Sequence, residues 1–366
     1  MNKLGFGCMR LPMIGGAEGT VDQQQFNQMI DRYLEAGFCY FDTAHVYISG
    51  QSETALREGL VKRYPRDRFF LVDKLSGSCF GSEGEIRPFF EMQLAALGTD
   101  HLDLYLMHSQ SKDVYEKFLS CNAYHVVRQL KQEGKIRHFG ISFHDTPEVL
   151  EKILSEQPDI EVVQIQLNYL DWDSPSIQSA GVYEVCRKYN KPILVMEPVR
   201  GGALSDLPEA AKKVLSDLGG GSAASYALRY AAEKEGVAMV LSGMSTLEQM
   251  EDNIATMKMR KPLTEREHEA LMQVKEILRQ QDAVPCTGCR YCVEGCPKNI
   301  PIPELFSVFN TKKRYADWGS DYYYNIAVSG KGKASHCIAC GKCEKVCPQH
   351  IPIRERLRDV RGVFEE

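Results

Sequence analysis

Eight cysteines near the C-terminus have the clearest chemical signature in the sequence. They form two runs with the spacing C-x2-C-x2-C-x3-C-P: Cys286, Cys289, Cys292, Cys296 and Pro297, then Cys337, Cys340, Cys343, Cys347 and Pro348. Three cysteines at this spacing can offer thiolates to three irons of a cubane, whereas the cysteine before proline points away and ligates the other cluster. The spacing therefore predicts two 4Fe–4S clusters with crossed ligands. Cluster 1 takes Cys286, Cys289, Cys292 and Cys347, and cluster 2 takes Cys337, Cys340, Cys343 and Cys296.

Zinc is the alternative metal for clustered cysteines. A zinc ion needs four ligands and is usually held by two separated C-x2-C pairs, so eight cysteines in this crossed pattern favour iron–sulfur clusters. The other cysteines are scattered along the chain, and we interpret them as small buried apolar side chains: Cys8, Cys39, Cys79, Cys121 and Cys186.

A second set of reactive side chains lies earlier in the chain, after three short apolar runs. Asp42 and Tyr47 belong to FDTAHVY, Lys74 ends RFFLVDKL, and His108 ends LDLYLMH. A nearby ammonium can lower the pKa of a tyrosine, a carboxylate can hold that ammonium, and a neutral imidazole can orient a carbonyl group. Each residue alone is more simply explained by packing or by a surface charge. Together they predict protonation of a carbonyl oxygen while hydride reaches the carbon.

The elements that position these residues repeat along the first part of the chain. Short apolar runs alternate with segments of helical periodicity, and the runs are 38–44, 68–75, 102–108, 137–142, 161–168, 191–198 and 237–244. Alternating strands and helices indicate a parallel α/β sheet. Seven runs, with a poorly marked eighth near 257–264, predict a closed (β/α)8 TIM barrel. The alternative, an open doubly wound sheet, usually has a glycine-rich loop after its first strand, and FDTAHVY has none.

A domain boundary is expected near residue 282. Residues 263–281 have the pattern of an amphipathic helix that closes the barrel, with Thr264 as N-cap and Glu267 completing a capping box. The composition then changes at DAVPCTGC. We therefore predict a barrel domain over 1–282 and a small, mainly α-helical dicluster domain over 283–366.

Charge and hydropathy exclude some classes of partner. Residues 283–366 hold 13 Lys and Arg against 9 Asp and Glu, while the whole chain has a net charge of -5. A basic tail can indicate nucleic-acid binding, but two clusters of about -2 each would cancel this charge. No run approaches the ~20 apolar residues of a membrane helix, and none near the N-terminus is long enough for a signal peptide. We expect a cytoplasmic protein without nucleic-acid or membrane partners.

Several stretches of the first domain resemble the aldo-keto reductases. They are FDTAHVY with GQSE, VDKL, LGTDHLDLYLMH, EGKIRHFGIS and VVQIQLNY, and they follow the order of that family over residues 1–260. The resemblance implies a catalytic tetrad of Asp42, Tyr47, Lys74 and His108, with Tyr47 as general acid/base. It also implies an NAD(P)(H) cofactor and a small carbonyl or alcohol substrate, with Ser142 and Gln164 on the nicotinamide carboxamide.

The nucleotide site departs from this family pattern. Phe143 and His144 stand where members often have Asn and Phe, and Met196, followed by Glu197, occupies the position of a stacking aromatic residue. The segment that grips the 2′-phosphate of NADP contains Gly243, Gln249 and Asn253 and no obvious cation. A phosphate dianion needs charge-assisted partners, so we predict at most a weak preference for NADP over NAD. Arg200, in EPVRGG, is a candidate pyrophosphate contact or a surface residue.

Residues 283–360 resemble the helical dicluster ferredoxins in iron–sulfur subunits of respiratory dehydrogenases. The whole chain is similar to a bacterial and archaeal subgroup of ferredoxin-containing aldo-keto reductases. Hydride transfer moves two electrons and a cluster moves one, and no flavin motif is present to couple them. Three functions therefore stay open: a redox enzyme that exchanges electrons with a ferredoxin or flavodoxin, a hydride-transfer barrel with structural or docking clusters, and a non-catalytic electron-transfer or regulatory protein.

Overall fold

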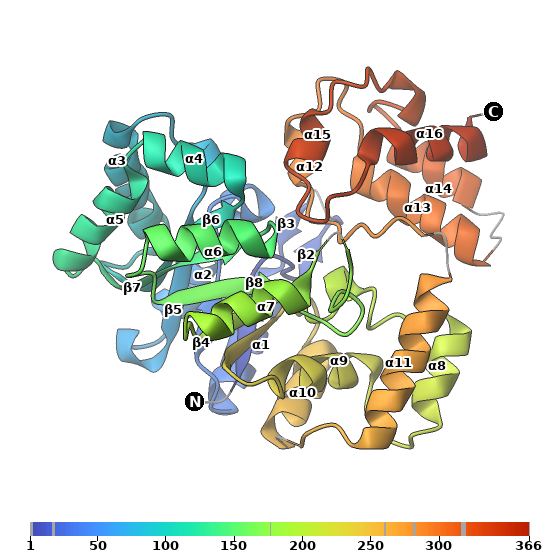
Figure 1. The fold of residues 1–366 in the computed structure, drawn as a ribbon, viewed down its shortest axis with the longest axis horizontal. Helices are drawn as coiled ribbons and strands as arrows, with labels where there is room; N and C mark the ends of the chain where they lie inside the picture. The colour runs from blue at the N-terminus through green and yellow to red at the C-terminus, as the bar shows by residue number, and fades with distance from the viewer. Residues whose placement is uncertain are drawn as a thin grey trace. The chain divides into compact units, whose positions relative to one another are not determined.

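The computed structural model describes residues 3–16, 19–175, 177–259, 261–280, 283–315 and 320–365. The chain forms two compact units (Figure 1). Unit 1 comprises Met1–Ser174, Gln178–Pro198 and Ala224–Leu263, and unit 2 comprises Pro175–Ile177, Val199–Ala223 and Thr264–Glu366. Within the described ranges, every helix is too short or too polar to cross a membrane.

Unit 1 is the predicted closed barrel of eight parallel strands, in the order β1-β10-β9-β8-β7-β6-β5-β4. The strands are β1 (Leu4–Gly7), β4 (Tyr40–Asp42), β5 (Phe70–Leu75), β6 (Leu102–Gln110), β7 (Ile136–Phe143), β8 (Val162–Gln166), β9 (Ile193–Met196) and β10 (Val237–Ser242). Helices surround them (Figure 1): α1 (Gln23–Glu35), α2 (Gln51–Leu56), α3 (Glu83–Leu97), α4 (Lys112–Ser120), α5 (Ala123–Gln132), α6 (Pro147–Glu156), α7 (Ser179–Lys188), α9 (Ala223–Ala232) and α10 (Leu247–Met259). A small antiparallel hairpin, β2 (Met13–Ile14) and β3 (Thr20–Val21), follows β1.

The eighth strand differs from the prediction. The segment near 257–264 is not a strand, because helix α10 runs to Met259 and the described residues 261–264 form none. The missing strand is β1, which pairs with both β10 and β4. The sequence of this strand, LGFG, lacks a strand-like pattern because half of its residues are glycine. Gly5 is needed there, since a Cβ would lie 2.5 Å from a side-chain carbon of Leu241 and 3.0 Å from one of Tyr40.

The barrel interior explains why polar side chains gather at one end. Apolar strand residues form a single core cluster: Tyr40, Val72, Leu104, Leu106, Val162, Leu194, Met239 and Leu241. Successive side chains of a strand point to opposite faces, so a residue two positions further along points the same way. Asp42, Lys74, His108 and Gln164 occupy such positions and are buried at the carboxyl ends of their strands.

Unit 2 is mainly helical. Helix α8 (Glu209–Ser216) packs against α11 (Glu265–Arg279), and the remaining helices are α12 (Tyr291–Glu294), α13 (Ile302–Tyr315), α14 (Ser320–Ala327), α15 (Lys342–Lys345) and α16 (Ile353–Phe364). The capping box of Thr264 and Glu267 is present, as predicted. Helix α11 belongs to this unit rather than to the barrel unit. The expected domain boundary near 282 remains a prediction.

The two cysteine runs fold as a structural repeat. Residues 51 positions apart share the left-handed backbone region: Gly288 and Ala339, Arg290 and Gly341, and Asn299 and His350. The isoleucines that follow each run are also buried in one common core, Ile300 and Ile302 with Ile351 and Ile353. The repeat therefore presents its two sets of cysteines in the same local conformation.

Candidate active site and cluster sites

Lys74 and Asp42 form a buried ion pair at the carboxyl ends of β5 and β4. Lys74 Nζ donates to Asp42 Oδ1 at 2.5 Å and to the Thr43 carbonyl oxygen at 2.7 Å, and the Lys74 side chain has no exposed surface. Gln164 Nε2 donates to the second carboxylate oxygen, Asp42 Oδ2, at 3.0 Å. A buried charge without a partner is costly, so these bonds fix the ammonium in one position.

Tyr47 and His108 face this pair. Tyr47 opens the short helical turn Tyr47–Gly50 after β4. Lys74 Nζ lies 4.7 Å from the centre of the Tyr47 ring, and the His108 ring meets that ring edge-on with 5.9 Å between centroids. The structure therefore brings together all four residues for which acid–base chemistry was predicted.

The pKa values of the two rings keep both of them uncharged near neutral pH. Burial and the charges of Lys74 and His144 hold the pKa of His108 well below its usual range. Burial and the negative charge of Asp42 raise the pKa of Tyr47 well above its usual range. We expected Lys74 to lower the pKa of Tyr47. The net pKa is nevertheless raised, because burial disfavours the phenolate and the Asp42 carboxylate adds a negative charge nearby.

Residues predicted to bind the nicotinamide lie on neighbouring strands. Ser142 on β7 is paired with Gln164 on β8, and Ser142 Oγ accepts a hydrogen bond from the Ser109 N–H at 2.8 Å. Met196 ends β9, and Glu197 follows it with a φ of 56°. This left-handed region is unusual for a residue other than glycine, asparagine or aspartate.

Arg10 is a cation at this end of the barrel that sequence reasoning missed. Its Nη2 lies 3.4 Å from Glu197 Oε1, and Glu197 Oε2 is buried without a hydrogen-bond partner among the described residues. A Cβ on Gly243 would lie 3.5 Å from Arg10 Cβ, so the arginine stem runs beside that glycine. No local sequence pattern identifies Arg10 as a site residue, because the residues beside it, Glu197 and Gly243, follow β9 and β10.

The last predicted nucleotide contacts are spread more widely. Gln249 Oε1 accepts the Ser245 N–H at 2.8 Å, and buried Asn253 donates to Ser242 Oγ at 2.8 Å, so both side chains brace the segment between β10 and α10. Arg200 lies in unit 2, in the turn Arg200–Gly202, and is not among the barrel residues.

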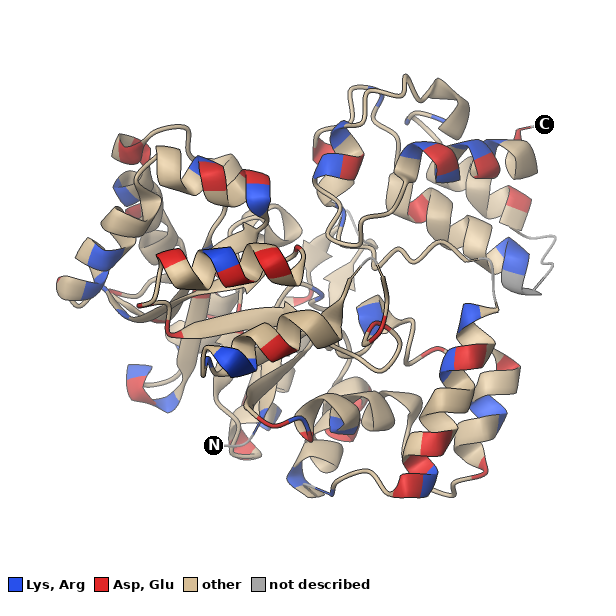
Figure 2. Cartoon of the chain, in the orientation of Figure 1, with Lys and Arg blue, Asp and Glu red and all other residues tan. Residues whose placement is uncertain are grey.

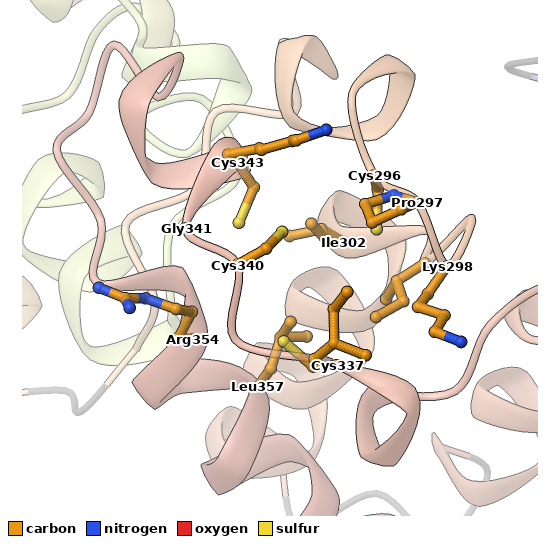
Figure 3. A pocket seen from close by; sticks show the side chains of 13 residues that line it. Cys296, Pro297, Lys298, Ile302, Cys337, Cys340, Gly341, Cys343, Arg354 and Leu357 are labelled. Carbon is orange, nitrogen blue, oxygen red and sulfur yellow. The ribbon is translucent and has the colours of Figure 1, made fainter.

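Two pockets in unit 2 are each lined by four cysteines. One is lined by Cys286, Cys289, Cys292 and Cys347, and the other by Cys296, Cys337, Cys340 and Cys343. Figure 3 shows the second set arranged around one space. Each pocket therefore takes three cysteines from one run and its fourth from the other run, in the combination that the spacing predicts.

The chemistry of both pockets fits a cluster with thiolate ligands. The eight cysteines are free thiols, and neither pocket has a carboxylate or imidazole among its described lining residues. Burial and the neighbouring cysteines raise the pKa of Cys292, and burial raises that of Cys343 to about 11. Thiolates in such surroundings need a positive partner, which iron supplies. The described His, Cys, Asp and Glu residues form no group of three or more around a single metal ion, and in a cubane each cysteine binds its own iron.

Comparisons with known proteins agree with both halves of this description. The sequence matches the Aldo/keto reductase family over residues 3–276 and a 4Fe-4S dicluster domain over residues 285–351. The chain belongs to the aldo/keto reductase family. A solved aldo-keto reductase, AKR11C1 from Bacillus halodurans in its holo form, has a TM-score of 0.60 and 26% identity, covering 74% of this chain and 91% of that one.

The curated relatives of this aldo/keto reductase carry names that give different activities. The uncharacterized oxidoreductase YqkF of Bacillus subtilis is 26% identical over 306 residues, 74% of this chain and 92% of the relative. The NADH-specific methylglyoxal reductase of Escherichia coli is 27% identical over 228 residues (56% and 66%). The NADPH-dependent alpha-keto amide reductase of Saccharomyces cerevisiae is 28% identical over 186 residues (50% and 56%). The last match spans little more than half of that relative.

Behind Lys74, this aldo/keto reductase contains an acid pair that sequence reasoning also missed. Asp73 is fully buried; its Oδ1 accepts the Lys74 N–H at 2.8 Å, and its Oδ2 has no donor among the described residues. The Asp73 and Glu53 carboxyls face each other, and His45 Nδ1 lies 2.8 Å from Glu53 Oε2. Burial raises the pKa of Asp73 well above its usual range and that of Glu53 to about 7. Because both pKa values are raised, the folded pair binds a proton more tightly than the same carboxyls do in the unfolded chain.

Proposed function

We propose that the barrel reduces a small-molecule carbonyl compound, or oxidises the corresponding alcohol, with NAD(P)(H). The observation that carries this proposal is the buried Lys74–Asp42 pair at 2.5 Å, with the Tyr47 ring 4.7 Å from the ammonium. Membership of the aldo/keto reductase family supports it. The alternative of a non-catalytic protein is weaker. Burying a charge pair beside two uncharged rings costs desolvation free energy, and a non-catalytic role gives no reason for that cost.

Each residue of the tetrad has a separate role in this proposal. The bound nicotinamide supplies the hydride. Tyr47, kept neutral by burial, gives its hydroxyl proton to the carbonyl oxygen as the alcohol forms. Lys74 stabilises the resulting phenolate, and Asp42 holds Lys74 in place. His108 is neutral. Ser76 Oγ lies 2.6 Å from its Nδ1 and orients the ring, so that Nε2 can form a hydrogen bond with the carbonyl oxygen of the substrate.

A hydroxyl deletion tests the role of Tyr47. In Tyr47→Phe we expect kcat for methylglyoxal and aromatic aldehydes to fall about 10²–10⁴-fold, because the proton donor is lost. Tyr40→Phe is the matched control, since the Tyr40 hydroxyl is buried without a hydrogen-bond partner among the described residues. Equal rates in the two variants, measured by NAD(P)H absorbance, would contradict the assignment.

For the nucleotide, we propose contacts from the barrel residues Ser142, Gln164, Met196, Glu197, Gly243, Gln249 and Asn253. The segment with Gly243 and Gln249 offers no cation of its own, and Arg10, which lies beside Gly243, is paired with Glu197, so the preference for NADP over NAD should be weak. The relatives include one NADH-specific and one NADPH-dependent enzyme. Fluorescence titration with both reduced nucleotides tests this; an NADPH dissociation constant far below that of NADH would refute it.

We propose that unit 2 binds two 4Fe–4S clusters through the crossed cysteine sets. Paired variants decide the crossing. In the crossed scheme, the double variant Cys292→Ser/Cys347→Ser removes two ligands of cluster 1 alone and should leave about four irons per chain. The double variant Cys343→Ser/Cys347→Ser removes one ligand from each cluster and should leave no iron. An uncrossed arrangement predicts the opposite result, so iron analysis after anaerobic reconstitution distinguishes the two schemes.

We propose further that the clusters pass electrons between the barrel chemistry and an external carrier such as a ferredoxin or flavodoxin. The competing hypothesis is a structural or docking role for the clusters, with hydride transfer alone in the barrel. Excess NADH or NADPH under anaerobic conditions should produce the EPR signal of reduced clusters. If dithionite gives the signal and both nucleotides fail, the clusters are uncoupled from the barrel.

Two smaller expectations belong with this function. Two clusters with eight thiolate ligands need a reducing compartment, so we propose a cytoplasmic location. We also retain the boundary near residue 282 between a barrel domain, 1–282, and a cluster domain, 283–366. Limited proteolysis that cleaves near 282 and leaves two stable fragments would support that boundary.

A further inference from the structure

The two cluster pockets differ in how far they are exposed. In the pocket of cluster 2, Cys340 is exposed, and the neighbouring Ile338 is 56% exposed. In the pocket of cluster 1, Cys292 is buried. Thr287, in the same loop, is also buried, and a Cβ on Gly201 of the same unit would lie 2.5 Å from its carbonyl oxygen. The loop of cluster 1 is therefore covered, while that of cluster 2 is open.

A groove adjoins the open pocket. It has a volume of about 540 Å³ and is lined by Ala334, Ser335, Cys337, Ala339, Glu344, Pro352, Arg354, Glu355, Leu357, Arg358 and Arg361. Cys337, Arg354 and Leu357 line both the groove and the pocket of cluster 2. Figure 3 shows these three side chains at the edge of the pocket. A molecule seated in the groove would therefore contact three residues that also line the cluster-2 pocket.

The groove has a basic wall, which we call the arginine groove after Arg354, Arg358 and Arg361. These residues recur at i, i+4 and i+7 along α16, so they follow one face of the helix. Glu344 also lines the groove and is paired with Arg354, because its Oε2 accepts from Arg354 Nε at 2.8 Å. Figure 2 shows further basic positions on α15, which carries Lys342 and Lys345. The lining also contains Glu355, so three arginines stand against two carboxylates, and Arg358 and Arg361 give the groove its excess of positive charge. This excess favours an acidic partner surface.

We propose that the arginine groove docks a small acidic one-electron carrier protein, and that cluster 2 is the cluster that exchanges electrons with it. In the exchange, the reduced carrier loses one electron and cluster 2 gains it, and no bond forms or breaks. Exposed Ile338 and Val346 (48% exposed) supply the apolar contact that protein interfaces combine with a charged rim. This inference rests on the proposed two-cluster function and adds the entry point and the partner chemistry.

A charge reversal in the groove tests the docking site. The full-length, anaerobically reconstituted protein is titrated at low salt with an acidic bacterial ferredoxin and with a flavodoxin. We expect Arg358→Glu to weaken binding about tenfold and to reduce its dependence on salt. The matched control is Arg356→Glu, on the same helix but outside the groove, where Arg356 Nη1 bonds Asp359 Oδ2 at 3.0 Å; its binding should change less than about twofold.

The cluster measurement separates this inference from the proposed function. Iron content and the EPR signal with dithionite are recorded first, and absent clusters would overturn the proposed function itself. With both clusters present, stopped-flow reduction by the reduced carrier should slow about tenfold in Arg358→Glu, while reduction by dithionite should not change. Binding of neither carrier, or equal losses in the two arginine variants, overturns the docking inference. A dimer that Arg358→Glu dissociates overturns it in favour of a second copy of this chain.

Discussion

Replacing Asp42 with asparagine measures how strongly the buried ion pair supports the active site. Asp42→Asn keeps the side-chain shape but leaves the Lys74 ammonium buried, with the Thr43 carbonyl as its remaining strong acceptor at 2.7 Å. At 2.5 Å and an effective dielectric constant of about 20, the attraction is about 7 kcal/mol before desolvation is subtracted. Breaking a buried pair from one side costs about 3–5 kcal/mol. We expect the free energy of unfolding of unit 1 to fall by that amount.

The double variant isolates the ion pair from other effects of substitution. Lys74→Met removes the other charge and keeps most of the side-chain volume. Asp42→Asn/Lys74→Met has no uncompensated charge, so its loss of stability should be smaller than the sum of the single losses by at least about 2 kcal/mol. Losses that simply add would refute the coupling that we assign to these two residues.

Urea denaturation with a single fluorescent reporter provides the assay. The chain has two tryptophans, so a Trp318→Phe background leaves Trp172, which packs on Tyr183 in unit 1 with ring centroids 5.4 Å apart. Asp100→Asn is the control for loss of a carboxylate, because the Asp100 side chain is 87% exposed. That substitution should leave the urea midpoint unchanged. A shift as large as that of Asp42→Asn would show that burial is not the cause.

The acid pair should make unit 1 less stable as pH rises from about 4.5 to 7, because the folded state keeps a proton that the unfolded chain releases. The pKa of Glu53 is raised to about 7, so Glu53→Gln should flatten that slope in urea titrations, and an unchanged slope would contradict the raised pKa. Gly201→Ala places a Cβ 2.5 Å from the Thr287 carbonyl and should lower the melting point of unit 2 by at least about 4 °C. Gly220→Ala, with open space around its Cβ in the described structure, should not. His108, whose pKa lies well below its usual range, should show no NMR titration between about pH 6 and 8.

The sequence predicts the parts of this protein whose chemistry is local or periodic. Spacing alone pairs Cys347 with the first cysteine run, because the repeat and its prolines fix where each thiolate points. Strand periodicity places Lys74 and His108 at the ends of apolar runs, and in a parallel barrel those ends converge. The grouping of these side chains at one end of the barrel was therefore predictable before any distance was known.

The rest depends on neighbours that are remote in the chain. Strand β1 was missed because Gly5 reflects crowding by Leu241 and Tyr40, which no local pattern reveals. Arg10 could be recognised as a site residue only from its contact with Glu197, which lies 187 positions away in the chain. The raised pKa of Tyr47 was missed for a related reason, since its main cause is burial, and the depth of burial is a property of the folded chain.

The crossed ligation that we propose also sets the order of events in cluster assembly. Cys292 and Cys347 are 55 positions apart, so at about 5–20 residues per second the ribosome needs about 3–11 s to supply the last ligand of cluster 1 after its first three. During that interval three neighbouring thiols stand ready for oxygen or for a competing metal ion. Neither cluster can be completed on a nascent chain that lacks the second cysteine run. Completion of both clusters must therefore wait for the second cysteine run, and the yield of loaded protein should depend on how well the first three thiols are protected until then.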